Sequence, residues 1–567
     1  MIYEERPWLK SYDPGVPPEI VISDPSLCHR FDAVRRAFPD RAAFHFLGRT
    51  LTFEEFFALS DKFASFLNDR NLGRGDVVTI NLPNLPQFLI ALVGALRAGC
   101  AASGLSPLNT ADEMAYQIND SGTKVLVTLD AIFEKRLAPA AEKVPGLETV
   151  VVTGLLDFLP RYKQVLAKWI KKIPTGKVFP LPGKEVAAFM DIFKNRPSDP
   201  PPLDMNQEDL CLIQYTGGTT GRPKGAELTH RNLLANVLQF QEWTKMELGK
   251  DVILSGFPFF HLAGLAPGLI SLSFGVTQVL IPNPRDTKHM TKEFARYKPT
   301  FTCNVPSLYQ MLVNEPGFRR LDFSNLQTCI SGAAPFSVEG INQLHEVVGP
   351  GKLLEVWGMT ETSPLITVNP SQGTKKIGSV GLPLPSTRLR VVDLETGENP
   401  VPLGEEGELI ASGPQVMRGY HNNPEETARA LREHDGAVWM HTGDVGRMDE
   451  DGFVYVVDRA KDMLIVGGFK VFSAEVEDKF YQHPAIGLCA LIGLPNPDRP
   501  DSEIVKLVVQ KSDLAKDKPD EELRADILAF AREKLAPYKV PKIVEFVEAM
   551  PLTAVGKVDK KALRPKR

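Results

Sequence analysis

The stretch "QYTGGTTGRPKG", residues 214–225, combines four glycines, four side chains that carry a hydroxyl group, and the basic residues Arg222 and Lys224. Glycine allows backbone conformations that turn several amide groups toward one point, and the hydroxyl and ammonium groups add further donors. The loop is therefore predicted to bind phosphate. It is not a P-loop, because neither Gly217 nor Gly218 is followed by Gly-Lys at the required spacing. Taken alone, a flexible surface turn remains the alternative.

Short apolar runs alternate with helical patterns on both sides of this loop. Residues 85–98 are expected to form a buried helix. The runs that predict buried strands are residues 75–84, 124–130, 209–216, 251–258, 326–332 and 352–358. Such alternation is typical of an α/β fold with mostly parallel strands.

The pattern of turn residues and apolar runs changes near residue 371. Residues 371–457 are rich in turns and short apolar runs, which predicts a small β-barrel or sandwich. We place a domain boundary near Asp458–Lys461. A compact tail follows, with two strands at 486–494 and 503–510, a helix near 520–535 and a last strand at 543–547.

Length and composition limit the class of protein. A chain of 567 residues is too long for one core. The net charge of −5 provides no basic field for nucleic acid. The six scattered cysteines form no Cys-x-x-Cys pair, which favours reduced, buried thiols in a cytoplasmic protein. The acidic N-terminus does not read as a secretory signal, and Arg97 interrupts the apolar run from Phe88 well before the length of a membrane span.

Residues 161–177, "RYKQVLAKWIKKIPTGK", contain six basic residues and no acidic one. Apolar side chains recur at helical spacing over 161–173. This pattern predicts a basic amphipathic helix that contacts an anionic membrane surface. A surface helix whose apolar stripe packs on the protein itself is the alternative.

Seven further motifs, in order along the chain, accompany the glycine-rich loop. With it they resemble the adenylate-forming superfamily of acyl-CoA synthetases, luciferases and adenylation domains. Gly217 stands where the family usually has serine, a variant similar to bacterial long-chain fatty-acid CoA ligases. The motifs are "FPFFHLAG" (257–264), "SGAAP" (331–335), "WGMTETSP" (357–364), "GELIASGPQVMRGYHNNPEET" (407–427), "HTGD" (441–444), "DRAKDMLIVGGFKVFSAEVE" (458–477) and "PLTAVGKVDKKALR" (551–564).

The resemblance implies a large N-terminal domain, residues 1–457, built of two α/β subdomains and a small β-barrel at about 371–457. A small mobile α+β domain, residues 458–567, is expected to follow a hinge near Lys461. The implied reaction forms an acyl-adenylate from ATP and a carboxylate, and then transfers the acyl group to CoA.

The same resemblance implies which residues bind ATP. The loop would hold the β- and γ-phosphates, and Asp444 with Arg459 the ribose. Trp357 occupies the position of a tyrosine that normally stacks on adenine. The expected ATP-binding residues are Thr216, Gly217, Gly218, Thr219, Thr220, Gly221, Lys224, Gly332, Ala333, Trp357, Asp444 and Arg459.

Four side chains are implied in the chemistry. Glu361 would ligate Mg²⁺, Thr360 would donate to the α-phosphate, and His261 would gate the carboxylate end of the pocket. Lys557 would bridge the carboxylate and the α-phosphate during adenylation. Taken without the motifs, a helix start capped by Thr360, a buried histidine and a surface lysine are the plain alternatives.

The second half-reaction is implied to use other residues of the C-terminal domain. Gly467 and Gly468 would line the path of pantetheine, and Lys461 would act as the hinge. The expected substrates are a medium- or long-chain fatty acid, ATP and CoA. The location is expected to be cytoplasmic, with peripheral membrane contact through 161–173. Homodimer formation is left open.

Other readings stay open at this stage. They are a CoA ligase for an alicyclic or aryl acid, an adenylation enzyme that loads a carrier protein, a luciferase-like oxygenase, and an AMP-binding regulatory protein. The presence of Glu361, Asp444 and Lys557 disfavours the regulatory protein.

Overall fold

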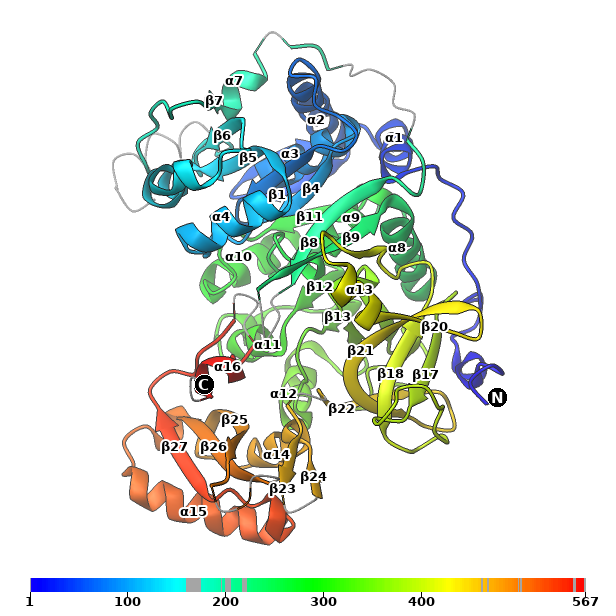
Figure 1. The fold of residues 1–567 in the computed structure, drawn as a ribbon, viewed down its shortest axis with the longest axis vertical. Helices are drawn as coiled ribbons and strands as arrows, with labels where there is room; N and C mark the ends of the chain where they lie inside the picture. The colour runs from blue at the N-terminus through cyan, green and yellow to red at the C-terminus, as the bar shows by residue number, and fades with distance from the viewer. Residues whose placement is uncertain are drawn as a thin grey trace.

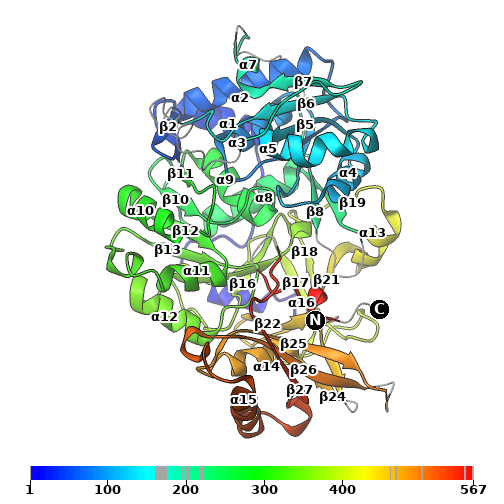
Figure 2. The same ribbon diagram turned by 90° about the vertical axis from the view of Figure 1, so that its left-hand side faces the viewer.

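The computed structural model of the protein describes residues 2–159, 175–194, 196–198, 205–216, 222–459, 462–466, 469–497, 499, 502–553 and 557–564. Two large mixed sheets and a smaller antiparallel sheet make up the upper and middle parts of the molecule in Figure 1. The C-terminal residues form a separate small sheet with its own helices at the lower end, which Figure 2 shows from the side.

The first large sheet has eight strands in the order β19-β9-β8-β4-β3-β5-β6-β7. Its central strands are parallel, as the α/β pattern predicted, and β8 and β9 form an antiparallel hairpin. The strands are β3 (Val77–Asn81), β4 (Ala101–Gly104), β5 (Thr123–Leu129), β6 (Thr149–Thr153), β7 (Glu185–Ala188), β8 (Leu210–Thr216), β9 (Lys224–Thr229) and β19 (Gly419–Tyr420).

The second large sheet has nine strands in the order β16-β15-β14-β13-β12-β10-β11-β1-β2. The strands are β1 (Ala42–Phe46), β2 (Arg49–Thr52), β10 (Val252–Ser255), β11 (Thr277–Leu280), β12 (Phe301–Asn304), β13 (Thr328–Ser331), β14 (Leu353–Gly358), β15 (Leu365–Val368) and β16 (Leu382–Pro383). The N-terminal strand β1 pairs in parallel with β11, more than two hundred residues later in the chain. The sequence patterns did not reveal this pairing, because it depends on packing between distant segments.

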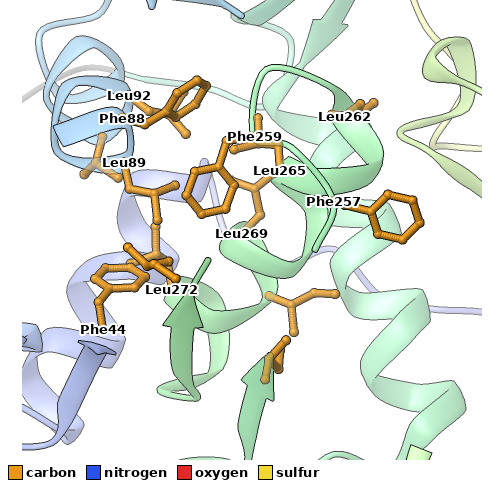
Figure 3. Packing of buried hydrophobic residues seen from close by; sticks show 14 of the residues in the cluster. Phe44, Phe88, Leu89, Leu92, Phe257, Phe259, Leu262, Leu265, Leu269 and Leu272 are labelled. Atoms are coloured by element: carbon orange, nitrogen blue, oxygen red, sulfur yellow. The ribbon is translucent and has the colours of Figure 1, made fainter. Parts of the chain in front are cut away.

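Helices α3 (Pro86–Arg97) and α9 (Leu262–Phe274) contribute to one continuous apolar core with strands of both large sheets. Every residue of α3 except Arg97 is buried, which confirms the prediction of a buried helix. Figure 3 shows Phe88 of α3 beside Phe259, with ring centroids 5.5 Å apart. Gly94 lets α3 approach its neighbour closely, since a Cβ there would lie 2.7 Å from the carbonyl oxygen of Ser60.

The remaining long helices of the large domain surround these sheets. Several begin at residues that the sequence marks as caps: Thr52 accepts a hydrogen bond from the amide of Glu55, and Glu55 reaches back to the amide of Thr52. The helices are α1 (Leu27–Ala37), α2 (Phe53–Asn68), α4 (Ala111–Asp120), α8 (His230–Thr244), α10 (Thr287–Tyr297), α11 (Pro306–Val313), α12 (Val338–Val348) and α13 (Pro424–Ala430).

The segment 371–457 differs in part from the expected small barrel. A five-stranded antiparallel sheet contains β17 (Arg388–Val392), β18 (Gly407–Ser412), β20 (Leu431–His434), β21 (Ala437–Met448) and β22 (Val454–Arg459). However, β16 and β19 of the same segment pair with the two large sheets, and α13 interrupts it. Trp8, near the N-terminus, is buried in the core of this region. The segment therefore ties the sheets together.

The C-terminal region follows the sequence prediction closely. Strands β25 (Ile486–Pro495), β26 (Glu503–Lys511) and β27 (Ile543–Val547) form one sheet, with α14 (Ser473–Phe480) and α15 (Asp520–Lys534). A short hairpin of β23 (Leu464–Val466) and β24 (Phe469–Val471) precedes them, and α16 (Lys560–Leu563) ends the described chain. The region has its own apolar core. The expected mixed α/β class, with a large N-terminal and a small C-terminal domain, is confirmed; the boundary near 458–461 stays a prediction.

Two sequence expectations concern surfaces and thiols. All six cysteines are free and buried, as expected for reduced thiols. Among the described residues, no helix has the length and apolar character needed to cross a bilayer. The basic segment 161–173 lies outside the described residues.

Candidate functional site

The two ends of the glycine-rich loop are held by a β-hairpin. Thr216 ends β8 and Lys224 begins β9, and the two residues are paired across the hairpin. The loop residues Gly217, Gly218, Thr219, Thr220 and Gly221 lie outside the described residues. The hairpin therefore fixes where the loop starts and ends.

Lys224 makes two contacts with the "GYHNNPEET" segment. Its ammonium forms an ion pair with Glu426 of α13 and lies 4.9 Å from the ring centroid of Tyr420. The pKa of Glu426 is lowered, chiefly by its hydrogen bond with Lys224, and burial opposes this shift only in part. The position of the Lys224 ammonium is therefore fixed by an acidic side chain and an aromatic ring.

Glu361 lies one turn after the end of β14, in a short 3-10 helix, η5 (Thr360–Thr362). Its side chain is buried, and Oε1 accepts a hydrogen bond of 2.6 Å from the phenol of Tyr420. Burial, and then the negative charge of Glu361, raise the pKa of Tyr420 well above its usual value, so the phenol stays a donor. Thr360 is the first residue of η5 and not its cap, because Met359 occupies the cap position.

Gly332 and Ala333 form the turn after β13. A Cβ on Gly332 would lie 2.6 Å from Cγ2 of Val356 on the neighbouring strand, so only glycine fits there without a shift. Ala333 has a φ of 69°, in the left-handed region. This conformation costs energy for a residue other than glycine, and such residues are concentrated at ligand sites. The turn brings bare backbone beside the end of β14, where Trp357 lies.

Asp444 lies opposite Arg459 in the β21–β22 pair. The carboxylate is buried, and Nε of Arg459 lies 2.9 Å from Oδ1. Trp357 donates its indole N–H to Oδ2 over 2.8 Å. The hydrogen bond joins the nine-stranded sheet to the five-stranded sheet, and it was not foreseen from the sequence.

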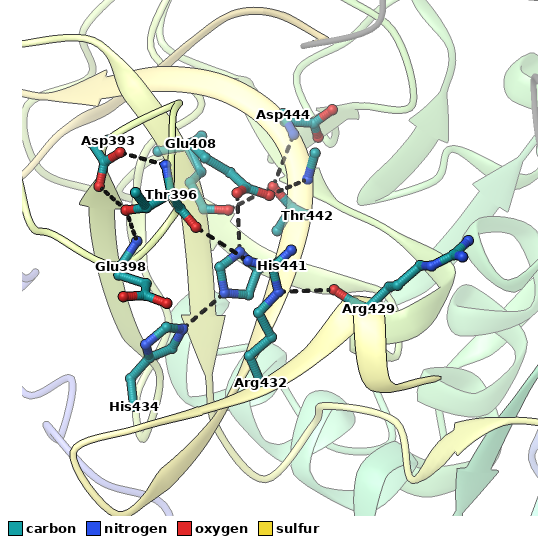
Figure 4. A network of polar contacts seen from close by, with 12 residues as sticks. Asp393, Thr396, Glu398, Glu408, Arg429, Arg432, His434, His441, Thr442 and Asp444 are labelled. Atoms are coloured by element: carbon teal, nitrogen blue, oxygen red, sulfur yellow. Dashed lines mark hydrogen bonds and ion pairs between the residues drawn. The ribbon is translucent and has the colours of Figure 1, made fainter. Parts of the chain in front are cut away.

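A polar network supports the part of β21 that carries Asp444 (Figure 4). Glu408 accepts a hydrogen bond of 3.0 Å from the amide of Gly443 and pairs with Nδ1 of His441 at 3.0 Å. His441 in turn contacts His434, with 2.9 Å between their Nε2 atoms. Burial alone would raise the pKa of Glu408, but the hydrogen bond and charge of His441 and the amide of Gly443 lower it. The "HTGD" segment of β21 is therefore held by an ionised glutamate.

His261 precedes α9 at the N-cap position. Its Nε2 is buried and makes no hydrogen bond within the described part of the chain. Burial, and then the positive charge of Lys557, lower the pKa of His261 to about 4. The imidazole is therefore neutral, and Lys557 lies near enough to act on it. The backbone of Lys557 bonds Thr553 in both directions: its amide donates to Oγ1 of Thr553 over 3.2 Å, and its carbonyl accepts from the amide of Thr553 over 2.7 Å.

These interactions bring seven of the expected residues together in three groups. Lys224 and Glu361 meet at Tyr420, and Trp357 and Arg459 meet at Asp444. The charge of Lys557, from the C-terminal domain, acts on His261. The expected residues Lys461, Gly467 and Gly468 lie outside the described residues, like those of the phosphate loop.

Sequence reasoning missed Tyr420 and Glu426. Both belong to the motif at 407–427, so the signal was present, but no charge pattern within the motif points to Glu361 or Lys224. Only β19, which pairs Tyr420 with Ala226, places the motif against the glycine-rich hairpin.

Comparison with known proteins agrees with this arrangement. The AMP-binding enzyme family matches residues 31–421, and the AMP-binding enzyme C-terminal domain matches residues 475–557. Long-chain-fatty-acid–CoA ligases of Bacillus subtilis (strain 168) and Salmonella typhimurium (strain LT2) are each 37% identical to this chain, over 564 and 573 residues, covering 99% of it and 98% of each relative.

Solved structures of the same architecture also match. The crystal structure of an ATP-bound RpMatB-BxBclM chimera superposes with a TM-score of 0.83 at 30% identity, over 95% of this chain and 98% of that one. The match covers the large domain and the C-terminal domain together, so the overall fold is shared. The chain belongs to the family of AMP-binding enzymes.

Proposed function

We propose that this enzyme joins a medium- or long-chain fatty acid to CoA in two half-reactions. The carboxylate first attacks the α-phosphorus of ATP, which forms an acyl-adenylate and releases pyrophosphate. The thiol of CoA then attacks the acyl carbon, and AMP leaves. The observation that carries the proposal is the similarity to long-chain-fatty-acid–CoA ligases over nearly the whole chain.

Adenylation brings anions together, so it needs fixed positive charge and alignment. We assign this charge to Lys557 at the reacting carboxylate and to Lys224 at the β- and γ-phosphates. The neutral state of His261 suits a place beside a fatty acid, because an imidazolium would attract the carboxylate away from Lys557. Thr360, at the start of η5, would donate its hydroxyl to the α-phosphate.

Glu361 is the residue that would hold Mg²⁺, which supplies charge stabilisation to the phosphates when bound. The buried carboxylate uses Oε1 for Tyr420 and is the only acidic side chain assigned to the ion. No cluster of three metal-ligating side chains, of His, Cys, Asp or Glu, occurs in the described ranges. This fits magnesium, which is usually bound through one or two carboxylates together with phosphates and water.

The nucleoside would lie between the turn at Gly332 and Ala333 and the ring of Trp357. Asp444 would accept hydrogen bonds from the ribose hydroxyls, with Arg459 beside it. Thr216, Gly217, Gly218, Thr219, Thr220 and Gly221 would surround the phosphates, as the resemblance of the loop implies.

The second half-reaction is assigned to a rotated state of the C-terminal domain. Lys461 would be the hinge, and Gly467 with Gly468 would line the path of pantetheine. A proline at 461 fixes φ near −65°, so Lys461→Pro should leave a first release of pyrophosphate intact and stop transfer to CoA. Unchanged acyl-CoA formation in this variant would contradict the hinge.

An assay of CoA-dependent AMP release over acids of graded length tests the function. We expect activity to need ATP, Mg²⁺ and CoA together and to peak at medium to long chains. Faster turnover of acetate or benzoate than of decanoate and palmitate would overturn the fatty-acid assignment and favour an aryl or short-chain acid. Transfer to a carrier protein in preference to CoA would favour the adenylation-enzyme alternative.

Peripheral contact of residues 161–173 with a membrane remains a proposal, as do the cytoplasmic location and a homodimer. Each basic residue near an anionic surface contributes about 1 kcal/mol to binding. Replacing Lys168, Lys171 and Lys172 by glutamate should reduce sedimentation with anionic vesicles and leave turnover of a soluble short acid unchanged. Equal sedimentation of both proteins would favour packing of the helix on the protein itself.

A further inference from the structure

Trp357 contacts Asp444 through its ring edge, not through its ring face. The indole nitrogen lies 2.8 Å from Oδ2, and both side chains are buried. The ring face is what stacking on a base requires, whereas the indole N–H is a donor on the ring edge that cannot accept, unlike the phenol of the tyrosine usual at this position. The contact therefore gives this chain's tryptophan a second role that stacking does not explain.

The hydrogen bond determines how much of the Asp444 carboxylate is left for a ligand. An ionised carboxylate has about four acceptor positions, two on each oxygen. Trp357 takes one on Oδ2, and the ion pair with Arg459 takes one on Oδ1. One position remains on each oxygen, which is the number that two neighbouring ribose hydroxyls need.

The two contacts also hold the carboxylate in one orientation. The backbone of Asp444 is fixed separately, because its amide donates to Oγ1 of Thr442 over 3.1 Å and Thr442 donates to the carbonyl of Leu409. The remaining freedom is rotation of the carboxylate, and donors on both oxygens oppose that rotation. A group that is already oriented loses less entropy when a ligand binds.

On this basis, and resting on the proposed use of Asp444 for ribose, we propose that Trp357 is a positioning residue for ribonucleotide recognition. Its indole N–H orients the Asp444 carboxylate so that the free position on each oxygen faces the 2′- and 3′-hydroxyl groups. The enzyme should therefore discriminate against nucleotides that lack these hydroxyls, and part of this discrimination should depend on Trp357.

The test measures binding of AMP and of 2′,3′-dideoxy-AMP by calorimetry to the full chain and to Trp357→Phe. Phenylalanine keeps an aromatic face and loses the N–H. For AMP we expect the variant to bind about tenfold more weakly, the loss typical of a hydrogen bond to a charged group. For dideoxy-AMP we expect the affinities of the two proteins to agree within about twofold, because this ligand has no ribose hydroxyl to bond the Asp444 carboxylate.

A double-mutant cycle provides a second measurement. In the Asp444→Ala background, Trp357→Phe should leave the affinity for AMP almost unchanged, since the carboxylate that Trp357 orients is absent. Equal losses on AMP and dideoxy-AMP, or an equal loss in the Asp444→Ala background, would overturn the proposal and leave stacking alone. Near-UV circular dichroism and the melting temperature of each variant show whether it is folded.

The same experiment separates this proposal from the proposed function. If the unaltered protein does not bind AMP, the assignment of the site to a nucleotide fails. If the unaltered protein binds AMP and dideoxy-AMP equally well, Asp444 does not bind the ribose hydroxyls. If it binds AMP more tightly and Trp357→Phe reduces both affinities alike, only the positioning role fails.

Discussion

Two polar clusters, one around Asp444 and one around Lys560, differ in what they leave for a ligand. We call Trp357, Asp444 and Arg459 the Asp444 cluster. The Lys560 cluster consists of Lys560, Ser473, Glu477 and Asp458. In the Lys560 cluster, the ammonium lies 2.6 Å from the hydroxyl of Ser473 and 2.8 Å from Oε1 of Glu477.

The charges of the Lys560 cluster are satisfied by the chain itself. Oε1 of Glu477 also accepts from the amide of Leu491 over 2.6 Å, and Oδ2 of Asp458 accepts from the amide and the hydroxyl of Ser473. Burial alone would lower the pKa of Lys560, yet the charges of Glu477 and Asp458 raise it. The lysine therefore stays charged and paired inside the domain.

The difference shows that burial and charge alone do not identify a ligand site. Both clusters contain buried carboxylates. Each oxygen of Asp444 keeps one acceptor position beside Trp357 and Arg459, whereas Oε1 of Glu477 and Oδ2 of Asp458 each have two partners within the chain. The Lys560 cluster instead connects α16, three residues beyond Lys557, to α14 and to the end of β22. We infer that it holds the segment that carries Lys557, whereas the Asp444 cluster holds a nucleotide.

The largest expected effect concerns Lys557, the residue of the C-terminal domain that we assign to adenylate formation. Lys557→Ala removes a charge-assisted contact in the transition state, so adenylate formation should fall by roughly 30- to 1000-fold. Thioester formation from pre-made acyl-adenylate and CoA should be largely spared. Single-turnover release of pyrophosphate and mass spectrometry of the thioester measure the two steps.

The exposed Lys561 provides the matched control. Lys561→Ala should leave both half-reactions unchanged. Equal losses of both half-reactions in Lys557→Ala would show that its effect is structural, and would place Lys557 with the Lys560 cluster.

A pH effect on stability is expected from the buried His230 of the large domain. Burial lowers the pKa of His230 from its ordinary value of 6.5 to about 4, and its Nδ1 accepts from the amide of Leu27. Between these values the unfolded chain binds more protons than the folded chain, so the free energy of unfolding should decrease as the pH falls. One such histidine contributes about 3 kcal/mol over this window.

Urea unfolding between pH 7 and pH 4 measures this effect for the protein and for His230→Gln. The variant lacks the titrating group, so its unfolding free energy should change less steeply with pH. Parallel pH curves would rule out His230 as a source of acid sensitivity, whatever the stability of the variant at neutral pH.

Breaking the Lys560 cluster should destabilise the C-terminal domain. Removing one member of a buried ion pair leaves a charge without its partner and typically costs 3–5 kcal/mol. Since Lys560 and Glu477 keep 18% and 15% of their side-chain surface exposed, we expect about 3 kcal/mol for Lys560→Met. Limited proteolysis and thermal unfolding should locate the loss in residues after 458.

Lys561→Met is the matched control, because it makes the same substitution at an exposed neighbouring lysine. The difference between the two variants gives the contribution of the buried contacts. A Lys560→Met protein as stable as Lys561→Met would mean that the cluster contributes specificity and little stability, as happens for some buried ion pairs. AMP binding should be the same in both variants.

The smallest expected effect concerns Tyr420. Its phenol donates to the buried Glu361, so Tyr420→Phe should raise the Mg²⁺ concentration needed for pyrophosphate release by about 30-fold, or about 2 kcal/mol. Binding of Mn²⁺ in the presence of an ATP analogue, followed by electron paramagnetic resonance, measures the same change without turnover.

Tyr455→Phe is the matched control, since it removes a phenol that bonds Asp449 over 3.3 Å in the five-stranded sheet. Its metal dependence should equal that of the unaltered protein. A metal affinity unchanged by Tyr420→Phe would contradict the positioning of Glu361 by Tyr420.

Much of the architecture was readable from local patterns. The predicted tail at 486–547 matches β25, β26, α15 and β27 within a few residues, because apolar alternation and helical periodicity are local properties. The buried helix α3 was likewise evident from its apolar run. The family motifs located Glu361, Asp444 and Lys557 by order along the chain, although they contained no information on distances.

The sequence by itself therefore determined which chemical groups are available and in which local elements they lie. Tertiary structure alone decided that β1 joins the second sheet, that Tyr420 meets Glu361, and that Trp357 donates to an aspartate 87 residues away. Each of these is a contact between segments distant in the chain. Such contacts depend on how whole sheets pack against one another, because a side chain's partner is set by the position of the backbone that carries it.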